Sequence, residues 1–225
     1  MASGTVGTAL LDLARHFGLN AIGTCSAANM AVVESFGAKA IDYRDGDFVE
    51  AVRQLTAAQA NAHNGRAGVD AAFDAIGGAH FARSFACLAS GGLLVGYGSQ
   101  TMADGREGLL SAGLGLARLH LWGAFKFLFS GRSAVWYGIT SQRKKQPEEF
   151  KADMAILFGL LRDGAIHPVV IDRLPLAAAR EVHTRIDAGG LGGKIVLIPW
   201  PVPLTDTRPA TARVGDSGPP PAPSP

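Results

Sequence analysis

Short apolar runs alternate with segments of helical periodicity over the first hundred residues. The apolar runs have the length of buried strands, and glycine or polar residues bound them. They are residues 20–25, 38–43, 69–76 and 91–98. Between them, apolar side chains recur every three or four positions, which predicts helices at residues 8–15, 28–36, 48–60 and 80–89. Strands that alternate with helices across short connections predict βαβ units, and therefore an α/β fold with a doubly wound parallel sheet.

Two positions mark where these helices begin and end. Gly37 follows the helix 28–36 at the place where a left-handed C-terminal residue belongs. Asp45 is the candidate N-cap of the helix 48–60, because its carboxylate can accept hydrogen bonds from the first turn.

The pattern changes in the last third of the chain. Residues 147–162 form an amphipathic helix whose apolar face carries Phe150, Met154, Leu157, Phe158 and Leu161. The pattern then predicts an extended segment at 166–171, a helix at 176–188 and a strand at 194–198. From Pro199 onward the chain is rich in Pro, Ser, Thr and Ala, so we expect residues 200–225 to be a disordered tail.

One apolar stretch, residues 109–139, resembles a membrane segment in composition. Arg118, Lys126 and Arg132 interrupt it, and it contains no window of eighteen residues without a charge. We therefore expect no transmembrane segment. A buried or interface pair of helices is the favoured interpretation, and association with a membrane surface is the alternative.

Charge and cysteine content exclude several kinds of protein. The net charge is only +2, and the chain has no basic stripe interleaved with aromatic residues, so we expect no nucleic-acid partner. Cys25 and Cys87 have no CxxC partners, and the six histidines have no metal-binding spacing. We assign no metal. Two isolated cysteines without a secretory signal favour a reducing, cytoplasmic location.

Glycines near the start of the chain lead directly into the first helix. Ser3, Gly4, Thr5 and Val6 precede or open that helix, and Gly7 follows them. Such a turn presents backbone N–H groups at the positive end of a helix dipole, which can bind the diphosphate of a dinucleotide. The alternative is a purely structural turn, because a glycine pair before a helix is a weak signal alone.

The residues after this helix bear on which dinucleotide could bind. A carboxylate about 20 residues past the glycines would bind the ribose of NAD, but residues 13–33 contain no Asp or Glu. Ser26 and Asn29 can instead donate to a 2′-phosphate, Arg44 can add charge, and Tyr43 can stack on adenine. This combination favours NADP(H) over NAD. The alternatives are a helix cap for Ser26, a half-buried ring for Tyr43 and a solvated surface position for Arg44.

Asp70 and Asp74 are the other candidate functional pair. Four positions along a strand separate them by about 13 Å, too far to share a proton, so we expect a structural use.

Six ordered motifs give the chain a family resemblance. They are residues 2–7, 37–44, 74–78, 91–99, 164–176 and 193–197. In this order they resemble the zinc-free, quinone-reductase-like (zeta-crystallin-like) branch of the medium-chain dehydrogenase/reductase superfamily. The resemblance implies a Rossmann-like domain of strand order 3-2-1-4-5-6, and by it this chain begins after the first strand and is N-terminally truncated.

The resemblance also implies domains and site residues. It implies an NADP-binding domain at 1–165 with an apolar helical insert at about 109–140. A C-terminal segment at 166–199 would belong to a catalytic domain that is absent here. By analogy, Ile76, Gly77, Tyr97 and Gly98 line the nicotinamide ribose, and Lys194 lies near the cofactor. Plain turn glycines and a surface lysine are the alternatives.

The function that follows is an NADP(H)-dependent oxidoreductase, or its cofactor domain. In intact relatives hydride passes to a quinone or an α,β-unsaturated carbonyl, so the expected partner is a small-molecule electron acceptor, and a homodimer is a further expectation. No catalytic residue is assigned. Two alternatives remain: a non-catalytic dinucleotide-binding or interaction module, and a truncated product of a misplaced start codon.

Overall fold

The computed structural model describes residues 2–60, 67–98, 117, 131–188 and 191–199. Most of the apolar stretch 109–139 and the tail 200–225 lie outside this part of the chain, so the expectations for them remain predictions. No helix within the described ranges has the length and apolar character needed to span a membrane.

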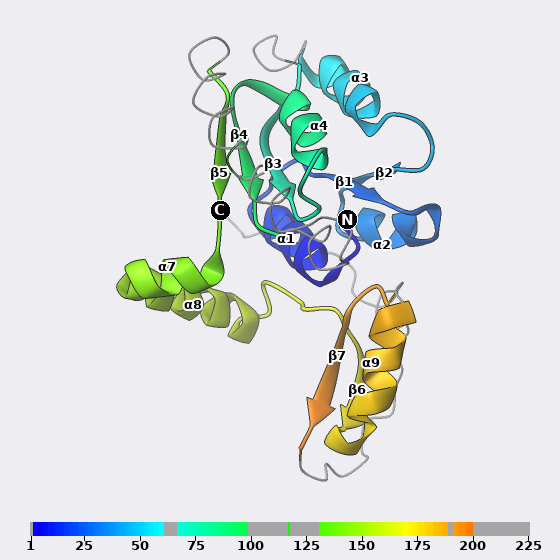
Figure 1. The fold of residues 1–225 in the computed structure, drawn as a ribbon, viewed down its shortest axis with the longest axis vertical. Helices are drawn as coiled ribbons and strands as arrows, with labels where there is room; N and C mark the ends of the chain where they lie inside the picture. Colours follow the sequence, from blue (N-terminus) through cyan, green and yellow to red (C-terminus); the bar gives the residue numbers. More distant parts are fainter. Residues whose placement is uncertain (1, 61–66, 99–116, 118–130, 189–190, 200–225) are drawn as a thin grey trace, which may run out of the picture.

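The first hundred residues alternate between strands and helices, as expected (Figure 1). The strands are β1 (Ile22–Cys25), β2 (Lys39–Asp42), β3 (Val69–Asp74) and β4 (Leu88–Gly96). The helices are α1 (Thr5–His16), the 3-10 turn η1 (Ala27–Asn29), α2 (Met30–Glu34), α3 (Phe48–Ala60) and α4 (His80–Ala86). Helix α3 has the predicted bounds, and Gly37 is left-handed at φ 77° as its position required. The predicted helix 28–36 is instead split between η1 and α2.

The N-cap expected at Asp45 is wrong. Asp47 performs this function, because its Oδ1 accepts a hydrogen bond from the Val49 N–H at 3.1 Å. Asp47 directly precedes the first helical residue, which is where an N-cap belongs.

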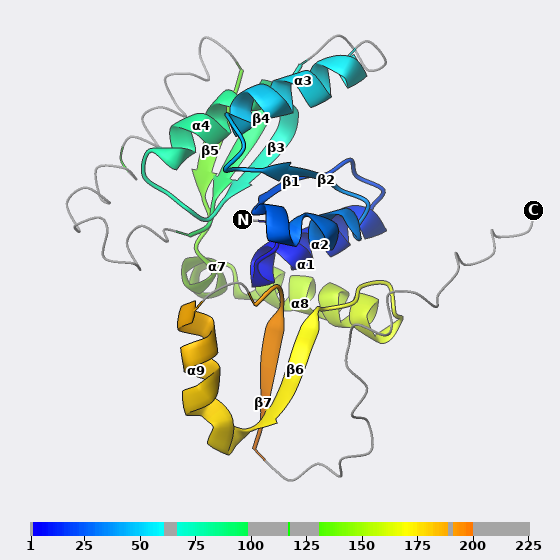
Figure 2. The same ribbon diagram turned by 90° about the vertical axis from the view of Figure 1, so that its right-hand side faces the viewer.

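All described strand pairs are parallel, and they form three separate sheets. Strand β1 pairs with β2, and Ile22 lies opposite Lys39. Strand β4 lies between β3 and β5 (Ser133–Trp136), and Leu94 lies opposite both Ala72 and Ala134. Figure 2 shows these two sheets in the upper part of the molecule, with α3 and α4 over them. The arrangement is the expected α/β fold with parallel strands.

Strands β1 and β3 each leave one edge without a strand partner among the described residues. The carbonyl of Cys25 bonds β2 through the Tyr43 N–H, so the alternate residues Ile22 and Thr24 turn their backbone groups away from β2. The carbonyl of Asp74 bonds the Tyr97 N–H, so Ala71 and Phe73 likewise turn away from β4. In the strand order 3-2-1-4-5-6 that the resemblance implies, the family's first strand would lie between these two edges.

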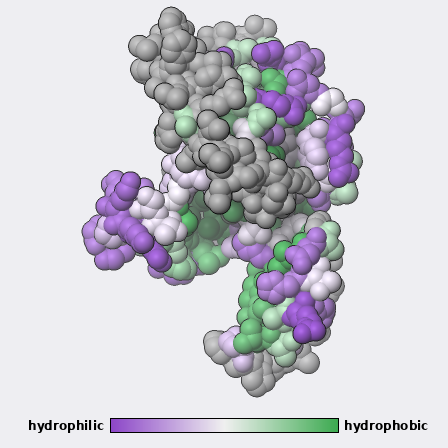
Figure 3. All heavy atoms as spheres, in the orientation of Figure 1, coloured by the Kyte–Doolittle hydropathy of each residue, from purple (hydrophilic) through white to green (hydrophobic). Residues whose placement is uncertain are grey.

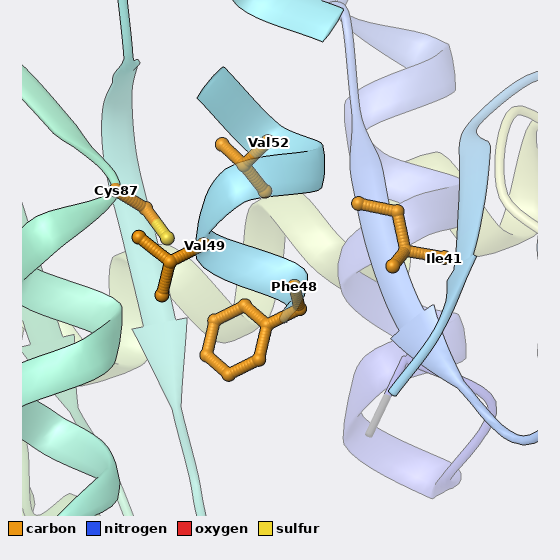
Figure 4. Packing of buried hydrophobic residues seen from close by; sticks show 5 residues of the cluster. All are labelled: Ile41, Phe48, Val49, Val52 and Cys87. Carbon is orange, nitrogen blue, oxygen red and sulfur yellow. The ribbon is translucent and has the colours of Figure 1, made fainter. Parts of the chain in front are cut away.

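Helix α3 packs against both parts of the interrupted sheet. Phe48, Val49 and Val52 on this helix are buried between Ile41 of β2 and Cys87, which precedes β4 (Figure 4). Ile22 of β1 and Val69 of β3 pack against the same cluster. The hydrophobic core is therefore continuous across the two sheets even where their hydrogen bonding is not.

A second cluster lies under α4, where Phe81 and Phe85 pack on Leu88 and Leu94. Gly96 belongs to this region because a Cβ at its position would lie 2.9 Å from the Phe81 ring and 3.2 Å from the Trp136 ring. A side chain there would displace one of the two aromatic rings.

The segment after residue 131 differs from its prediction. Ser133–Trp136, which we assigned to the apolar helical insert, form β5 at the edge of the sheet. Ala134 and Trp136 pack on the cluster under α4, which explains why an extended conformation is favoured there. A short helix, α7 (Ile139–Lys145), follows and was also not predicted.

The remaining elements are α8 (Pro147–Arg162), β6 (Val170–Pro175), the 3-10 turn η2 (Leu176–Ala178), α9 (Ala179–Ala188) and β7 (Lys194–Ile198). Helix α8 and strand β7 have the predicted bounds. The apolar face of α8 is not buried, since Phe158 remains 62% exposed. Strands β6 and β7 form a two-stranded lobe with α9 on one side, and Figure 3 shows hydrophobic surface over β7 and hydrophilic surface over α9.

Candidate functional site

The first turn of α1 offers backbone N–H groups and no side chain that competes for them. Its N-cap is Gly4, which has no side-chain oxygen, and the turn has no acidic residue. The first intrahelical bond runs from the Thr8 N–H to the Gly4 carbonyl at 2.8 Å. The N–H groups before Thr8 therefore have no acceptor within the helix. Together with the helix dipole they favour an anion.

Strand β1 places this turn at its carboxyl end. The Ala2 N–H donates to the Thr24 carbonyl at 2.7 Å, and a Cβ on Gly23 would lie 2.6 Å from the Ala2 Cβ. Gly23 is therefore required for the close approach of the two segments. Ser3 is buried here, whereas Val6 is exposed.

Lys194 of β7 reaches the same turn from the far end of the sequence. Its Nζ donates to the Thr5 carbonyl at 3.3 Å. Partial burial lowers the pKa of Lys194, and the nearby Asp12 carboxylate opposes that shift. Asp12 is itself buried, bonds Arg15 at 2.7 Å and accepts a hydrogen bond from the His167 N–H. The fold thus adds a lysine to the edge of the proposed anion site.

The four residues assigned to the adenosine end lie together at the carboxyl ends of β1 and β2. The Tyr43 N–H donates to the Cys25 carbonyl at 3.1 Å, which brings Tyr43 next to Ser26. The Asn29 amide donates to the Ser26 hydroxyl at 3.3 Å. Ser26 occupies the N-cap position of η1, but its hydroxyl makes no capping hydrogen bond. The Arg44 guanidinium lies 5.5 Å from the centre of the exposed Tyr43 ring.

Asp42 is a charged residue at this corner that we did not single out from the sequence. Its Oδ1 accepts a hydrogen bond from the Arg44 N–H at 2.9 Å, which fixes the turn carrying Arg44. It also contributes, after burial, to raising the pKa of the Cys25 thiol. An aspartate two residues before a turn position is the ordinary signal for such a bond.

The carboxyl end of β3 carries a buried carboxylate with several hydrogen-bond donors. Asp74 Oδ1 accepts from the Ile76 N–H at 2.8 Å and the Gly77 N–H at 3.2 Å. Asp74 Oδ2 accepts from the Ser84 hydroxyl at 2.6 Å and lies 2.8 Å from His80 Nδ1. Burial raises the pKa of Asp74, but the bonds from His80, Ser84 and Ile76 outweigh it and lower the pKa overall. The structural use expected for Asp74 agrees with these bonds.

Aromatic and charged side chains surround His80. Its ring stacks on Phe48 at 5.1 Å, and the Arg83 guanidinium lies 4.2 Å from the same phenyl ring. Arg83 also bonds Asp47 at 2.8 Å, although both side chains are largely exposed. Sequence reasoning missed His80 and Ser84. The available signal was their spacing, because positions four apart share the face of α4 that follows Asp74.

The end of β4 lies beside this turn. The Tyr97 N–H donates to the Asp74 carbonyl at 3.0 Å, and a Cβ on Gly98 would lie 3.1 Å from the Ala75 carbonyl oxygen. Burial, and then the charge of Asp74, raise the pKa of the Tyr97 hydroxyl. Ile76, Gly77, Tyr97 and Gly98 are therefore neighbours at the carboxyl edge of β3 and β4, where open α/β sheets bind ligands.

The residues present fit a dinucleotide better than a metal. Over the described ranges no three His, Cys, Asp or Glu side chains are grouped so that they could hold a metal ion. An uncapped helix turn with a nearby lysine suits a diphosphate.

A family model for zinc-binding dehydrogenases matches residues 36–197. The 2-haloacrylate reductase of a Burkholderia species is 28% identical over 201 residues, which are 88% of this chain and 54% of that protein. Quinone oxidoreductase 1 of Escherichia coli is 27% identical over 202 residues, which are 88% of this chain and 55% of that protein. The chain thus spans about half the length of these relatives.

The fold is also similar to solved structures. A mycobacterial protein whose native structure is complexed with NADPH is 28% identical, with a TM-score of 0.61 over 88% of this chain and 55% of that protein. This similarity agrees with the parallel-stranded fold described above.

Proposed function

From the premise that this chain belongs to the zinc-binding dehydrogenase family, in the quinone-oxidoreductase-like branch of the medium-chain dehydrogenase/reductase superfamily, we propose that it binds NADP(H) as the cofactor unit of an oxidoreductase. Residues 1–165 form the nucleotide-binding unit in this proposal, and residues 166–199 belong with a catalytic domain. The proposal assigns no metal to this chain, and over the described ranges no three His, Cys, Asp or Glu side chains are grouped so that they could hold one.

The observation that carries the proposal is the uncapped first turn of α1. Its N–H groups at Thr5, Val6 and Gly7 have no acceptor within the helix, and Lys194 Nζ lies beside them on the Thr5 carbonyl. A diphosphate there gains the helix dipole and a lysine charge. The NADPH complex of the mycobacterial relative supports the same ligand class.

The corner formed by Ser26, Asn29, Tyr43 and Arg44 supports NADP(H) over NAD(H). The Ser26 hydroxyl and the Asn29 amide can donate hydrogen bonds. Arg44 supplies a positive charge beside the exposed ring of Tyr43. A 2′-phosphate accepts hydrogen bonds and carries negative charge, so these groups suit it. The Asp42 carboxylate accepts a hydrogen bond from the Arg44 N–H and thereby stabilises the turn that carries Arg44.

The nicotinamide end of the proposed site is the edge formed by Ile76, Gly77, Tyr97 and Gly98. When bound, NADPH supplies the hydride, and the protein has to position and shield it. The residues at this edge contribute backbone and mostly apolar surface. The proposed acceptor is a small electrophile, a quinone or an α,β-unsaturated carbonyl, in keeping with the names of the reductases to which the chain is similar.

A second candidate function is dinucleotide binding without turnover. It is considered because every residue assigned to the site is assigned to the cofactor and none has a catalytic role. A homodimer is compatible with either function and is tested by the mass of the particle in solution.

Titration with NADPH and NADH, followed by nucleotide fluorescence, tests the proposal. We expect tighter binding of NADPH, and loss of binding in Gly4→Trp, whose indole fills the space at the first turn. Phe17→Trp is the matched control, because it places the same indole on an exposed residue just beyond the other end of α1. Failure of NADPH to bind would overturn the proposal, and equal affinity for NADH would overturn its choice of NADP(H).

Turnover is measured separately, as NADPH consumption with a quinone acceptor. Consumption that Gly4→Trp abolishes supports the oxidoreductase. Binding without consumption supports the second candidate.

A further inference from the structure

The buried carboxylate of Asp74 uses its two oxygens for different purposes. Oδ1 accepts the backbone N–H groups of Ile76 and Gly77, which form the turn after β3. Oδ2 accepts from the Ser84 hydroxyl and faces His80 Nδ1, both on α4. The carbonyl of the same residue accepts the Tyr97 N–H at the end of β4. One residue thus connects the turn, the helix and the neighbouring strand.

We infer that Asp74 is a positioning residue for the nicotinamide end of the NADP(H) site: it holds the Ile76–Gly77 turn in its binding conformation and joins it to Tyr97. This inference rests on the proposed function. Asp74 itself is nearly fully buried, and the inference gives it no contact with the ligand. Its effect on binding passes through the backbone of the turn.

The turn needs such a constraint because two successive glycines form it. Gly77 and Gly78 have φ values of +86° and +55°, a region that glycine enters freely and leaves as freely. The bonds to Oδ1 fix the Ile76 and Gly77 peptides, and the His80 N–H closes the turn on the Gly77 carbonyl at 3.0 Å. A turn ordered before the ligand arrives does not pay its ordering entropy on binding.

The separate use of the two oxygens allows a purely structural role to be distinguished from positioning. Ser84→Ala removes a bond to Oδ2 and leaves both turn bonds in place. Asp74→Asn keeps a carbonyl oxygen that can take the place of Oδ1, while its amide nitrogen faces Ser84 and His80, whose Oγ and ring nitrogen can accept. Asp74→Leu has a similar size and no acceptor at all.

The test compares NADPH affinity and thermal stability in these three variants and the wild-type chain. We expect Asp74→Leu to weaken NADPH binding by about tenfold or more, since both N–H groups of the turn lose a charged acceptor. Asp74→Asn should restore affinity to within about threefold of wild type. Ser84→Ala should lower the melting temperature while its NADPH affinity stays within the same range.

Equal NADPH affinity in folded Asp74→Leu and wild type would overturn the inference and leave the proposed function intact. A loss in Ser84→Ala as large as in Asp74→Leu would also overturn it, because affinity would then follow stability. If wild type itself does not bind NADPH, both the inference and the proposed function fall.

Amide hydrogen exchange of the wild-type chain decides the question if Asp74→Leu does not fold. The inference requires the Ile76 and Gly77 N–H groups to be protected before NADPH is added, because the bonds to Asp74 exist without ligand. Exchange of both amides at the rate of an unstructured peptide, in a chain that still binds NADPH, would overturn it.

Discussion

At the scale of single residues, the two aspartates that the described part of the fold buries, Asp12 and Asp74, both have hydrogen-bond partners. Asp74 is compensated by four donors, and Asp12 by Arg15 and the His167 N–H. Burying a carboxylate without such partners would cost several kcal/mol. The two cysteines are the complementary case, because they are buried as neutral, weakly polar side chains.

The acid sensitivity of the fold should depend on Asp74. Its lowered pKa means that the native state favours the ionised form, so it stabilises the fold above the ordinary aspartate pKa of about 3.9. That stabilisation is lost as the pH falls through the lower native pKa. We expect Asp74→Asn to cost about 1–3 kcal/mol at pH 7, and the difference from wild type to shrink between pH 5 and pH 3, by urea unfolding at each pH.

A difference between wild type and Asp74→Asn that stays constant down to pH 3 would show that the charge of Asp74 is not what stabilises the turn. Ser84→Ala is the control, because it keeps the carboxylate and both turn bonds and removes only one of the hydrogen bonds that lower the pKa of Asp74, so part of the pH dependence should remain.

Neither cysteine should react as a free thiol in the native protein. Burial raises the pKa of Cys87 to about 11, and burial also raises the pKa of Cys25. Only the thiolate is nucleophilic, so both should react with an aromatic disulfide reagent at pH 8 far more slowly than in urea. A rapid native reaction of either thiol would contradict its burial.

At the scale of elements, the hydrophobic pattern was most informative for segments whose secondary structure depends mainly on their own sequence. Helices α3 and α8 and strand β7 have the bounds predicted from periodicity. Strand β5 was missed, because only its pairing with β4 and the contact of Trp136 with Phe81 favour the extended form. The candidate site shows the same division. Ser26 and Arg44 were proposed from residue type and remain a prediction, whereas the contact of Asp74 with His80 depends on how α4 packs beside β3.

Substitution of one phenylalanine on α4 and one on α8 tests which of the two helices packs against the hydrophobic core. Phe85 of α4 is buried at 2% exposure, whereas Phe158 of α8 is 62% exposed. We expect Phe85→Ala to lower the free energy of unfolding by about 3–5 kcal/mol, and Phe158→Ala to change it by less than about 0.5 kcal/mol, in urea titrations. A large loss in Phe158→Ala would mean that α8 is covered by a partner in solution.

At the scale of the whole molecule, the sheet is interrupted while the core is not. Helix α3 packs across both sheets, but the edges of β1 and β3 remain without a strand partner among the described residues. The family resemblance made this interruption predictable, because the strand order that it implies has one further strand between the edges of β1 and β3. The placement of the lobe of β6, β7 and α9 was less predictable, since the contact of its Lys194 with Thr5 of α1 joins residues 189 positions apart.

Hydrogen exchange along β3 should reveal the open edge. The backbone groups of Ala72 face β4, whereas those of Ala71 and Phe73 face away from it. We therefore expect the Ala71 and Phe73 amides to exchange at least about tenfold faster than that of Ala72. Uniform protection of all three would mean that an extended segment pairs with this edge in solution.

The contact of Lys194 with the first turn of α1 has a thermodynamic consequence. The carbonyl of Thr5 accepts a hydrogen bond from Lys194, which lies 189 positions later in the lobe, and the same turn presents N–H groups that an anion could bind. An anion that gains from the lysine charge must, by reciprocity, tighten the attachment of the lobe by the same factor. Occupancy of the turn and docking of the lobe are therefore one linked equilibrium.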